Sequence, residues 1–339
     1  MKGTMKKNGA AKATVALLTF NGEAYIEEVL DAVLKQECNF VFEILVIDSG
    51  STDNTLTYVK EAFKKAHRPT RLIQIHPNEF NHGGTRNLAV KEAKGEYVAF
   101  LTQDATPVAN KWLQSYIDVF EQDMDIGVAF GPHVPRPGCN PVIKRDIEEV
   151  FKSFNTTDKP LIQKLVHGEN DQDLNGPLGF FSDVNSCVNK SIWKIIPYQT
   201  VCYAEDQLMG RDILKAGYKK AYVPNAAVYH SHTYPIMQYL RRYFDEYRGL
   251  NIALNYVDTN ATPLRGIVAS LIGARNDIKY ILSQGYSLSE KVKWSNAAIW
   301  INIFRRIGAY LGGRHKKLPV FICNLLSMEY QTKKGIRSK

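Results

Sequence analysis

The residues best suited to chemistry lie in four short stretches that contain Asp48, Asp104, Glu205-Asp206 and His230. One carboxylate of an adjacent acid pair can take the proton from an attacking hydroxyl group while its neighbour orients the substrate. Asp104 and His230 offer the oxygen and imidazole ligands that Mg²⁺ and Mn²⁺ accept. Such an ion neutralises the charge that develops on a diphosphate leaving group. The residue types therefore predict metal-assisted group transfer from a diphosphate donor.

Several of these acids also have a structural alternative. Glu205 and Asp206 come just before a predicted helical stretch at 207–216, where they would stabilise the positive end of the helix dipole. Asp104 comes shortly before Pro107, in a setting where aspartate commonly forms a turn. Asp53, considered alone, fits a helix cap better than a ligand contact. The predicted strands and helices help to decide between a structural role and a ligand-binding role, because they determine which acids lie at the same edge of a sheet.

Alternating strands and helices are expected to position the acids. The predicted strands span residues 14–19, 42–47, 71–75 and 97–102, and the predicted helices span residues 23–36, 55–66 and 84–93. This order predicts an α/β fold with a parallel sheet and right-handed crossovers. Ligands bind such sheets beyond the carboxyl ends of the strands. Polar residues follow all four strands, and we expect Asp48 to accept hydrogen bonds from a nucleobase or ribose.

The rest of the chain is less regular up to residue 256 and then helical. Beyond residue 125 we expect a polar helix at 143–154 and regular structure at 179–189 and 221–230, followed by helices at 264–282 and 291–311. The predicted organisation is a flexible lead at 1–12, a catalytic domain at 13–256 and a basic helical region at 257–339. The catalytic domain divides into a donor half at 13–125 and an acceptor half at 126–256.

Charge is unevenly distributed along the 339 residues. The whole chain has a net charge of +9, but residues 259–339 contain 14 lysines or arginines against three acids, which gives that region +11. A basic region of this kind suits an anionic membrane face or another polyanion, and a solvated helical surface is the alternative. It lacks the aromatic-interleaved basic motifs of nucleic-acid-binding proteins, so we expect no nucleic-acid partner.

The cysteines and the apolar segments indicate the compartment. Five scattered cysteines, without metal-binding spacing, are typical of reduced thiols in the cytosol. The sequence shows no secretion signal and no apolar stretch long enough to cross a bilayer. We therefore expect a cytoplasmic protein, peripheral at the inner face of the cell membrane.

Taken in order, the motifs resemble those of family 2 glycosyltransferases, which have the GT-A fold. The stretches that carry the resemblance are LLTFNGEAYIEEVLDAVLKQ, IDSGSTDNT, EFNHGGTRN, TQDA, AEDQLMGRDILKAGY and VYHSH. They run from about residue 13 to about residue 249, with a fainter continuation at 274–280. EFNHGGTRN is similar to the branch of bacterial rhamnosyltransferases that build cell-wall polysaccharide and O-antigen. The implied fold is a Rossmann-like, mostly parallel central sheet flanked by helices, with a C-terminal helical extension.

The resemblance also implies roles for individual residues. Asp206 would be the general base, with Glu205 as a supporting carboxylate. Asp104 and His230 would hold Mn²⁺ or Mg²⁺, with His232 as the second choice for the histidine. Gln103 stands where many relatives have an aspartate, a departure that bears on the strength of metal binding. The donor-binding set would be Thr19, Phe20, Asn21, Glu23, Asp48, Ser49, Asp53, Arg86, Gln103 and Asp104.

The implied reaction is the inverting transfer of L-rhamnose from dTDP-β-L-rhamnose to a glycan on a polyprenyl diphosphate. Residues 304–306 and 318–326 would then lie in the membrane interface. Two alternatives stay open: a transferase of the same fold that uses a UDP-hexose, and a non-catalytic nucleotide-sugar-binding subunit of a polysaccharide complex. Asp206 beside an intact donor rim argues against the second alternative. Apolar positions on the C-terminal helices leave a homo-oligomer open as well.

Overall fold

The computed structural model describes residues 10–154, 157–166, 174, 176–201, 203–258 and 262–333. The chain forms two units. The first comprises residues up to Val134, residues 151–201 and residues 205–230; the second comprises residues 135–150, residues 202–204 and the chain from Ser231 onward. Most of the predicted flexible lead, residues 1–9, lies outside the described residues, as do residues 334–339.

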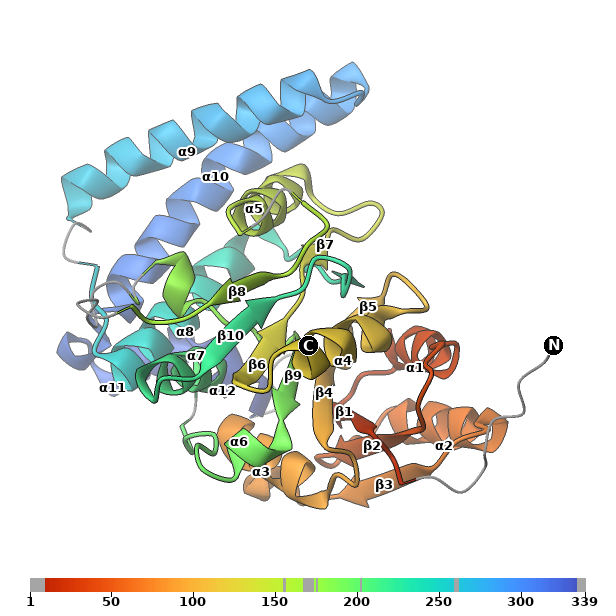
Figure 1. Cartoon of the computed structure of the whole chain (residues 1–339). Coiled ribbons are helices and arrows are strands. Elements are labelled where there is room, and N and C mark those ends of the chain that lie inside the picture. The colour runs from red at the N-terminus through yellow and green to blue at the C-terminus, as the bar shows by residue number, and fades with distance from the viewer. Residues whose placement is uncertain are drawn as a thin grey trace. The chain divides into compact units, whose positions relative to one another are not determined.

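An eight-stranded sheet forms the centre of the first unit, in the order β3-β2-β1-β4-β9-β6-β10-β8 (Figure 1). β9 runs antiparallel to β4 and β6, and β8 runs antiparallel to β10, whereas the other paired strands are parallel. A second, three-stranded sheet has the order β5-β11-β7. The predicted α/β class with a mostly parallel sheet is therefore confirmed.

The strands are β1 (Ala13–Thr19), β2 (Phe42–Asp48), β3 (Thr70–Gln74), β4 (Tyr97–Thr102), β5 (Thr106–Pro107), β6 (Ile126–Phe130), β7 (His133–Val134), β8 (Leu161–Gln163), β9 (Asn185–Asn189), β10 (Lys219–Tyr222) and β11 (Val228–Tyr229). The helices of the first unit are α1 (Ile26–Leu34), α2 (Thr55–Lys65), α3 (His82–Glu92), α4 (Trp112–Gln122), α6 (Lys190–Trp193) and α7 (Glu205–Lys215). α5 (Pro141–Lys152) belongs to both units.

Burial of apolar side chains explains why the central strands form. Every residue of β2 is buried, as expected for a strand that is covered on both faces by helices. The core includes large residues of α4, among them Trp112 and Tyr116, whose polar atoms both donate hydrogen bonds to Asn185 Oδ1, at 2.8 and 2.9 Å. Since Asn185 begins β9, these bonds attach the antiparallel strand to the helix layer.

Two predicted helix boundaries differ from the structure for local reasons. The helix predicted from residue 23 begins at Ile26, because the side chain of Glu23 is bonded to Asn54 and Asn21 has a positive φ of 47°. The helix predicted from residue 84 begins two residues earlier, at His82, because Asn81 Oδ1 accepts the backbone N–H of Gly84 at 2.9 Å and caps the helix there.

The segment predicted to be regular over residues 221–230 also differs from expectation. It contains two short strands in different sheets: β10 pairs with β6, and β11 pairs with β5 and β7. The turn between them is closed by the backbone N–H of Ala226, which donates to the carbonyl of Val223 at 3.0 Å. The chain therefore passes from the large sheet to the small one within a few residues of His230.

The second unit is helical and consists of part of α5 with α8 (Ile236–Leu254), α9 (Pro263–Ser283), α10 (Leu288–Gly312), α11 (Val320–Leu326) and α12 (Met328–Lys333). α10 packs against both α8 and α9, and the long α9 and α10 lie side by side (Figure 1). A small core of Val142, Tyr239, Ile281 and Ile301 joins these helices to α5. Among the helices that the structure describes, none combines the length and the apolar character needed to cross a membrane.

The described cysteines carry free thiols, as predicted. Cys38, Cys139, Cys187 and Cys323 are unpaired, and Cys202 lies outside the described residues. Burial raises the pKa of the Cys38 thiol to about 12. A thiol with so high a pKa is protonated near neutral pH and therefore a poor nucleophile.

Candidate active site

Asp48 organises the loop at the end of β2. Its Oδ2 accepts hydrogen bonds from the hydroxyl groups of Thr19, at 3.0 Å, and Ser51, at 2.5 Å. Its Oδ1 accepts the backbone N–H groups of Gly50 and Ser51, each at 3.0 Å. Asp48 is fully buried, so its carboxylate is surrounded by donors of its own loop. The structure thus adds a loop-forming role to this residue, and its contact with a nucleobase or ribose stays a prediction.

The loops that follow β1 and β2 are bonded to each other by side chains from both. Asn21 donates its backbone N–H to Ser51 Oγ at 2.9 Å, and its Oδ1 accepts the N–H of Thr52 at 2.8 Å. Glu23 Oε2 accepts both the backbone and the side-chain N–H of Asn54, each at 3.0 Å. The predicted donor-binding residues on these two loops therefore belong to one hydrogen-bonded layer.

Asp53 connects this layer to α2. Its Oδ1 accepts the backbone N–H of Thr55 at 3.0 Å, and its Oδ2 accepts the N–H of Glu23 at 3.1 Å. Burial acts to raise the pKa of Asp53, but the hydrogen bonds from Thr55 outweigh it and lower that pKa below its usual value. Asp53 thus lies one residue before the N-cap Asn54 and bonds the first residue of α2, and its predicted contact with the donor stays a prediction.

Gln103, which follows β4, bonds to the loop after β1 on the side of β1 that faces away from β2. Its Oε1 accepts the backbone N–H of Phe20 at 2.8 Å, and its Nε2 donates to the carbonyl of Phe20 at 3.1 Å. Ser49 adds a hydroxyl bond to the carbonyl of Thr19 at 3.0 Å. Of the ten predicted donor-binding residues, eight therefore lie in this connected group of loops: Thr19, Phe20, Asn21, Glu23, Asp48, Ser49, Asp53 and Gln103.

Asp104 and His230 are brought together by strand pairing. Asp104 lies two residues before the start of β5, and β5 pairs with β11, which ends next to His230. As a result, Asp104 Oδ1 and His230 Nε2 lie 3.7 Å apart, with side chains 18% and 14% exposed. His232 follows in the second unit, so its role as the alternative metal ligand stays a prediction.

Arg86 lies in a buried cluster of acids. Its Nε is 2.8 Å from Asp183 Oδ2, and its Nη1 is 2.7 Å from Glu205 Oε1. The guanidinium is 8% exposed, and Asp183 is fully buried and also accepts the hydroxyl groups of Ser186 at 2.6 Å and Tyr198 at 3.0 Å. The structure therefore gives Arg86 two carboxylate partners beside the predicted base, and its contact with the donor stays a prediction.

Asp206, the predicted base, has a raised pKa in this cluster. It is half-buried at the start of α7, where its Oδ1 accepts the backbone N–H of Gln207 at 2.8 Å. Burial, followed by the negative charges of Glu205 and Asp183, raises the pKa of Asp206 to about 8, against the opposing charge of Arg86. A carboxyl group of this kind exchanges its proton near neutral pH, as a general base requires.

The motif at residues 80–87 holds the chain that leads into α7. Asn87 Oδ1 accepts the backbone N–H of Tyr198 at 3.0 Å, and Asn87 Nδ2 donates to the carbonyl of the same residue at 2.8 Å. Asn81 Nδ2 donates to the carbonyl of Val201 at 3.1 Å. A Cβ on Gly83 would come within 2.0 Å of the carbonyl of Gln199, so only glycine permits this approach. The motif thus positions the segment that ends at Glu205-Asp206.

The residue before the acid pair has a strained backbone. Ala204 has a φ of 59°, in the left-handed region where the Cβ of an alanine is unfavourable. Asn21, on the donor-side loop, has a φ of 47°. Such conformations persist where the surrounding structure enforces them, and they are common at functional sites.

Sequence reasoning missed two components of this site. Asp183 lies in a stretch without regular structure just before β9, and no pattern marked it. Asn87 belongs to the glycine-bearing motif, but its type suggested no contact with residues more than 100 positions away. Both residues support the acid pair from other parts of the chain.

A family comparison identifies the class to which this fold and site belong. Residues 14–194, more than half of the chain, match the family described as Glycosyl transferase family 2. The chain therefore belongs to glycosyl transferase family 2 and is a glycosyltransferase with the GT-A fold. The predicted family and fold are confirmed.

Individual relatives are similar over almost the entire chain. The O-antigen chain rhamnosyltransferase RfbN of Salmonella typhimurium is 27% identical over 322 residues, which cover 94% of each protein. The O-antigen chain rhamnosyltransferase WbaN of Salmonella anatum is 29% identical, with 93% of each protein covered. Among solved structures, the mannosyltransferase PcManGT from Pyrobaculum calidifontis, in complex with GDP-Man and Mn²⁺, has the same fold at 17% identity. Its TM-score is 0.57, with 94% of this chain and 91% of that one covered.

Proposed function

We propose that the chain is an inverting glycosyltransferase that moves L-rhamnose from dTDP-β-L-rhamnose to a glycan carried on a polyprenyl diphosphate. The observation that carries the proposal is the half-buried Asp206, whose pKa is raised to about 8 beside Glu205 and Asp183. The full-length similarity to two O-antigen chain rhamnosyltransferases supports rhamnose as the sugar.

In this proposal Asp206 accepts the proton of the acceptor hydroxyl group. The hydroxyl oxygen forms a bond to the anomeric carbon while the bond from that carbon to the diphosphate oxygen breaks on the opposite face. The β-linked sugar of the donor therefore becomes α-linked in the product, and the nucleoside diphosphate leaves with the bonding electrons. Glu205 pairs with Arg86 at 2.7 Å, and its negative charge helps to raise the pKa of Asp206.

The donor and its cation are assigned to the strand ends. An aspartate oxygen and an imidazole nitrogen, 3.7 Å apart and half-buried, form a donor set that suits Mn²⁺ or Mg²⁺ at Asp104 and His230. When bound, the ion supplies neutralising charge for the departing diphosphate. The bonded loops around Asp48 and Gln103 would hold the nucleotide, since their polar residues line the carboxyl ends of β1, β2 and β4.

The acceptor proposal rests on charge. The C-terminal region, with its net +11, suits the anionic surface on which a polyprenyl diphosphate is carried. The protein would act from the cytoplasmic side, peripheral at the inner face of the cell membrane.

A donor screen tests the proposal directly. The full chain is incubated with Mn²⁺ or Mg²⁺, a lipid-linked acceptor, and dTDP-rhamnose, UDP-glucose or UDP-galactose in turn, and the product is identified by mass. We expect the added mass of one deoxyhexose from dTDP-rhamnose. Hexose addition from a UDP-sugar would replace the proposed donor. Donor binding without any transfer would instead identify a non-catalytic subunit.

Asp206→Asn tests the base. Because general-base catalysis contributes about 10²–10⁴ in rate, kcat is expected to fall by about that factor. Donor affinity, measured by calorimetry, should stay within a few-fold. The matched control is Asp118→Asn on an exposed position of α4, which should leave turnover unchanged. Near-normal turnover of Asp206→Asn would refute the assignment of the base.

A further inference from the structure

α9 carries its polar contacts inward and its apolar side chains outward. On the inner side, Asp277 is 1% exposed; its Oδ1 pairs with Arg145 Nη1 at 2.5 Å and its Oδ2 accepts Asn302 Nδ2 at 2.6 Å. The outward side presents five apolar residues that are each 49–73% exposed, namely Leu264, Ile267, Val268, Leu271 and Ile272. Their spacing of three and four residues places them on one face of the helix. This arrangement is the reverse of a helix that faces water.

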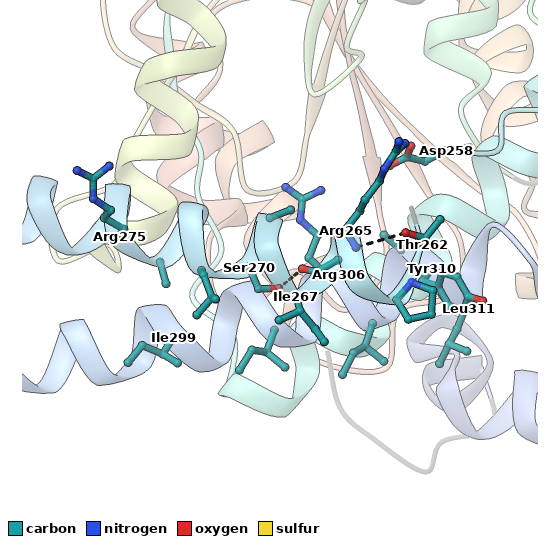
Figure 2. A pocket seen from close by; sticks show the side chains of 18 of the residues that line it. Asp258, Thr262, Arg265, Ile267, Ser270, Arg275, Ile299, Arg306, Tyr310 and Leu311 are labelled. Carbon is teal, nitrogen blue, oxygen red and sulfur yellow. Dashed lines mark hydrogen bonds between the residues drawn. The ribbon is translucent and has the colours of Figure 1, made fainter. Parts of the chain in front are cut away.

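A groove between α9 and α10 extends this apolar face. It has a volume of about 1000 Å³, and Ile267 of α9 and Ile299 of α10 are among its lining residues. Figure 2 shows Arg275 towards one end of the groove and Tyr310 and Leu311 towards the other. Since Ile299 is itself 41% exposed, the groove is open to the surroundings along its apolar lining.

The charges around the groove are predominantly positive. Among its described lining residues, the bases are Arg265, Arg275, Lys279 and Arg306, and the acid is Asp258. Asp258 precedes α9, and the acid within α9, Asp277, is directed inward to Arg145. The outward face of α9 therefore combines apolar side chains with basic ones, the composition of a helix that lies in the surface of an anionic bilayer.

We propose that the outward face of α9, with the adjoining groove, docks the protein on an anionic lipid bilayer. Leu264, Ile267 and Leu271 enter the boundary between headgroups and acyl chains, and Arg275 and Lys279 contact lipid phosphates. The inference deepens the proposed function, on which it rests for a lipid-borne acceptor, by assigning the membrane contact to particular residues.

Charge favours a bilayer over a second copy of this chain. If two α9 faces met, exposed Arg275 and Lys279 would approach the same groups of the other copy, and like charges repel. The structure also corrects one residue of the interface predicted at residues 304–306, since Arg306 is exposed and lines the groove whereas Arg305 is buried. Arg305 is only 9% exposed and pairs with Asp146 at 2.5 Å, so its guanidinium is unavailable to lipids.

Vesicle sedimentation of the full chain tests this docking face. Vesicles of phosphatidylcholine alone are compared with vesicles that contain phosphatidylglycerol, and the bound fraction is measured at low and high salt. We expect binding to the anionic vesicles that weakens with salt. The triple variant Leu264→Ser, Ile267→Ser, Leu271→Ser should bind at least about tenfold more weakly, because it removes most of the inserted apolar surface. The matched control is Met124→Ser with Ile195→Ser, at residues of the first unit that are 65% and 67% exposed, and it should bind like the wild type.

The charge component has its own variant. Arg275→Glu with Lys279→Glu should weaken binding to anionic vesicles by about tenfold or more, since each basic group near such a surface contributes measurably. Lys64→Glu with Lys65→Glu on α2 makes the same change in net charge at another exposed site and should have little effect.

Three results would overturn the proposal. The first is a wild-type chain that does not bind anionic vesicles. The second is unchanged binding of the triple variant, which would favour the exposed Val320, Phe321 and Leu325 of α11 instead. The third is a wild-type dimer that the triple variant converts to a monomer, without an effect on lipid binding. Transfer of sugar to a water-soluble acceptor should persist in both α9 variants, so failure of the docking proposal is distinguishable from failure of the proposed reaction.

Discussion

Asp53 and Asp206 lie at the N-terminal ends of two helices of the same unit, yet they titrate in opposite directions. Around Asp53 the neighbours are hydrogen-bond donors, and its pKa is lowered despite burial. Around Asp206, burial and then the negative charges of Glu205 and Asp183 raise the pKa to about 8. Both carboxylates lie near the N-terminal end of a helix, where the helix dipole favours negative charge. The difference shows that burial and the groups facing the carboxylate, rather than its place near a helix, determine its proton affinity here.

The comparison separates two kinds of polar structure. The donor-side loops satisfy their acids with neutral hydroxyl and amide groups, which give a stable shape over a wide range of pH. The acid cluster instead balances three carboxylates against the guanidinium of Arg86, at 2.7 and 2.8 Å from two of them. Its charge changes with pH, which suits proton transfer. The following three predictions, in descending order of expected effect, alter one side of this contrast at a time.

Arg86→Met should have the largest effect because it leaves Asp183 and Glu205 buried without their cation. Breaking a buried ion pair by removing one partner costs about 3–5 kcal/mol of unfolding free energy. Urea denaturation measures the loss. The control is Lys12→Met, which breaks a surface pair with Glu96 at 2.9 Å and should cost less than about 1 kcal/mol. Equal losses in the two variants would mean that Arg86 does not neutralise the cluster.

Asp206→Asn should stabilise the protein at the same time as it removes the proposed base. The folded protein holds the Asp206 proton up to about pH 8, whereas the unfolded chain releases it near pH 4. Between these values the folded state binds more protons, so this group lowers stability as pH rises. At pH 9 the full difference of about four pKa units would correspond to about 5 kcal/mol, and solvent screening of this half-buried group reduces the expected gain to a few kcal/mol. Denaturation at pH 5 and pH 9 measures this difference, and a gain that does not increase with pH would contradict it.

Asp53→Ala should have the smallest effect, through the loss of its hydrogen bonds from the first residue of α2 and from Glu23. Loss of such hydrogen bonds to a charged group costs about 1–3 kcal/mol when buried, and about 1 kcal/mol is expected at this half-buried position. Because the pKa of Asp53 is lowered on folding, its contribution is present above the unfolded pKa and fades as pH falls below about 4. Thermal unfolding at pH 7 and pH 3 tests this dependence against Glu61→Ala on the exposed side of the same helix. A cost that is independent of pH would assign the effect to helix packing instead of the carboxylate.

Local patterns predicted the donor half of the fold well. The strands of the sheet have apolar runs whose ends coincide with polar residues, and these ends meet because parallel strands point in one direction. The sequence therefore located Asp48 and Asp104 correctly at strand ends. It also placed Glu205-Asp206 at a helix start, which the structure has as the first turn of α7.

Local sequence patterns did not predict the contacts between segments that are far apart in the chain. Arg86 and Asp183 are nearly 100 residues apart, and nothing in either local pattern indicates their ion pair. The antiparallel β9 between β4 and β6 was not predicted either, because strand direction follows from the path of the irregular segment before it. The segment predicted as one regular stretch also contains two strands, β10 in the large sheet and β11 in the small sheet. Local hydrophobicity does not distinguish one strand from two.

The Gln103 side chain has a consequence for how this family position can vary. β1 and β4 pair as far as Leu18 and Thr102, and the amide of Gln103 then exchanges two hydrogen bonds with the backbone of Phe20. The side chain thereby imitates a peptide group and adds one rung to the ladder after the two strands have separated. An aspartate, which accepts but does not donate when ionised, cannot form both bonds. An aspartate at position 103 would add negative charge for binding a cation, but it would lose at least one of the two hydrogen bonds that hold the loop after β1.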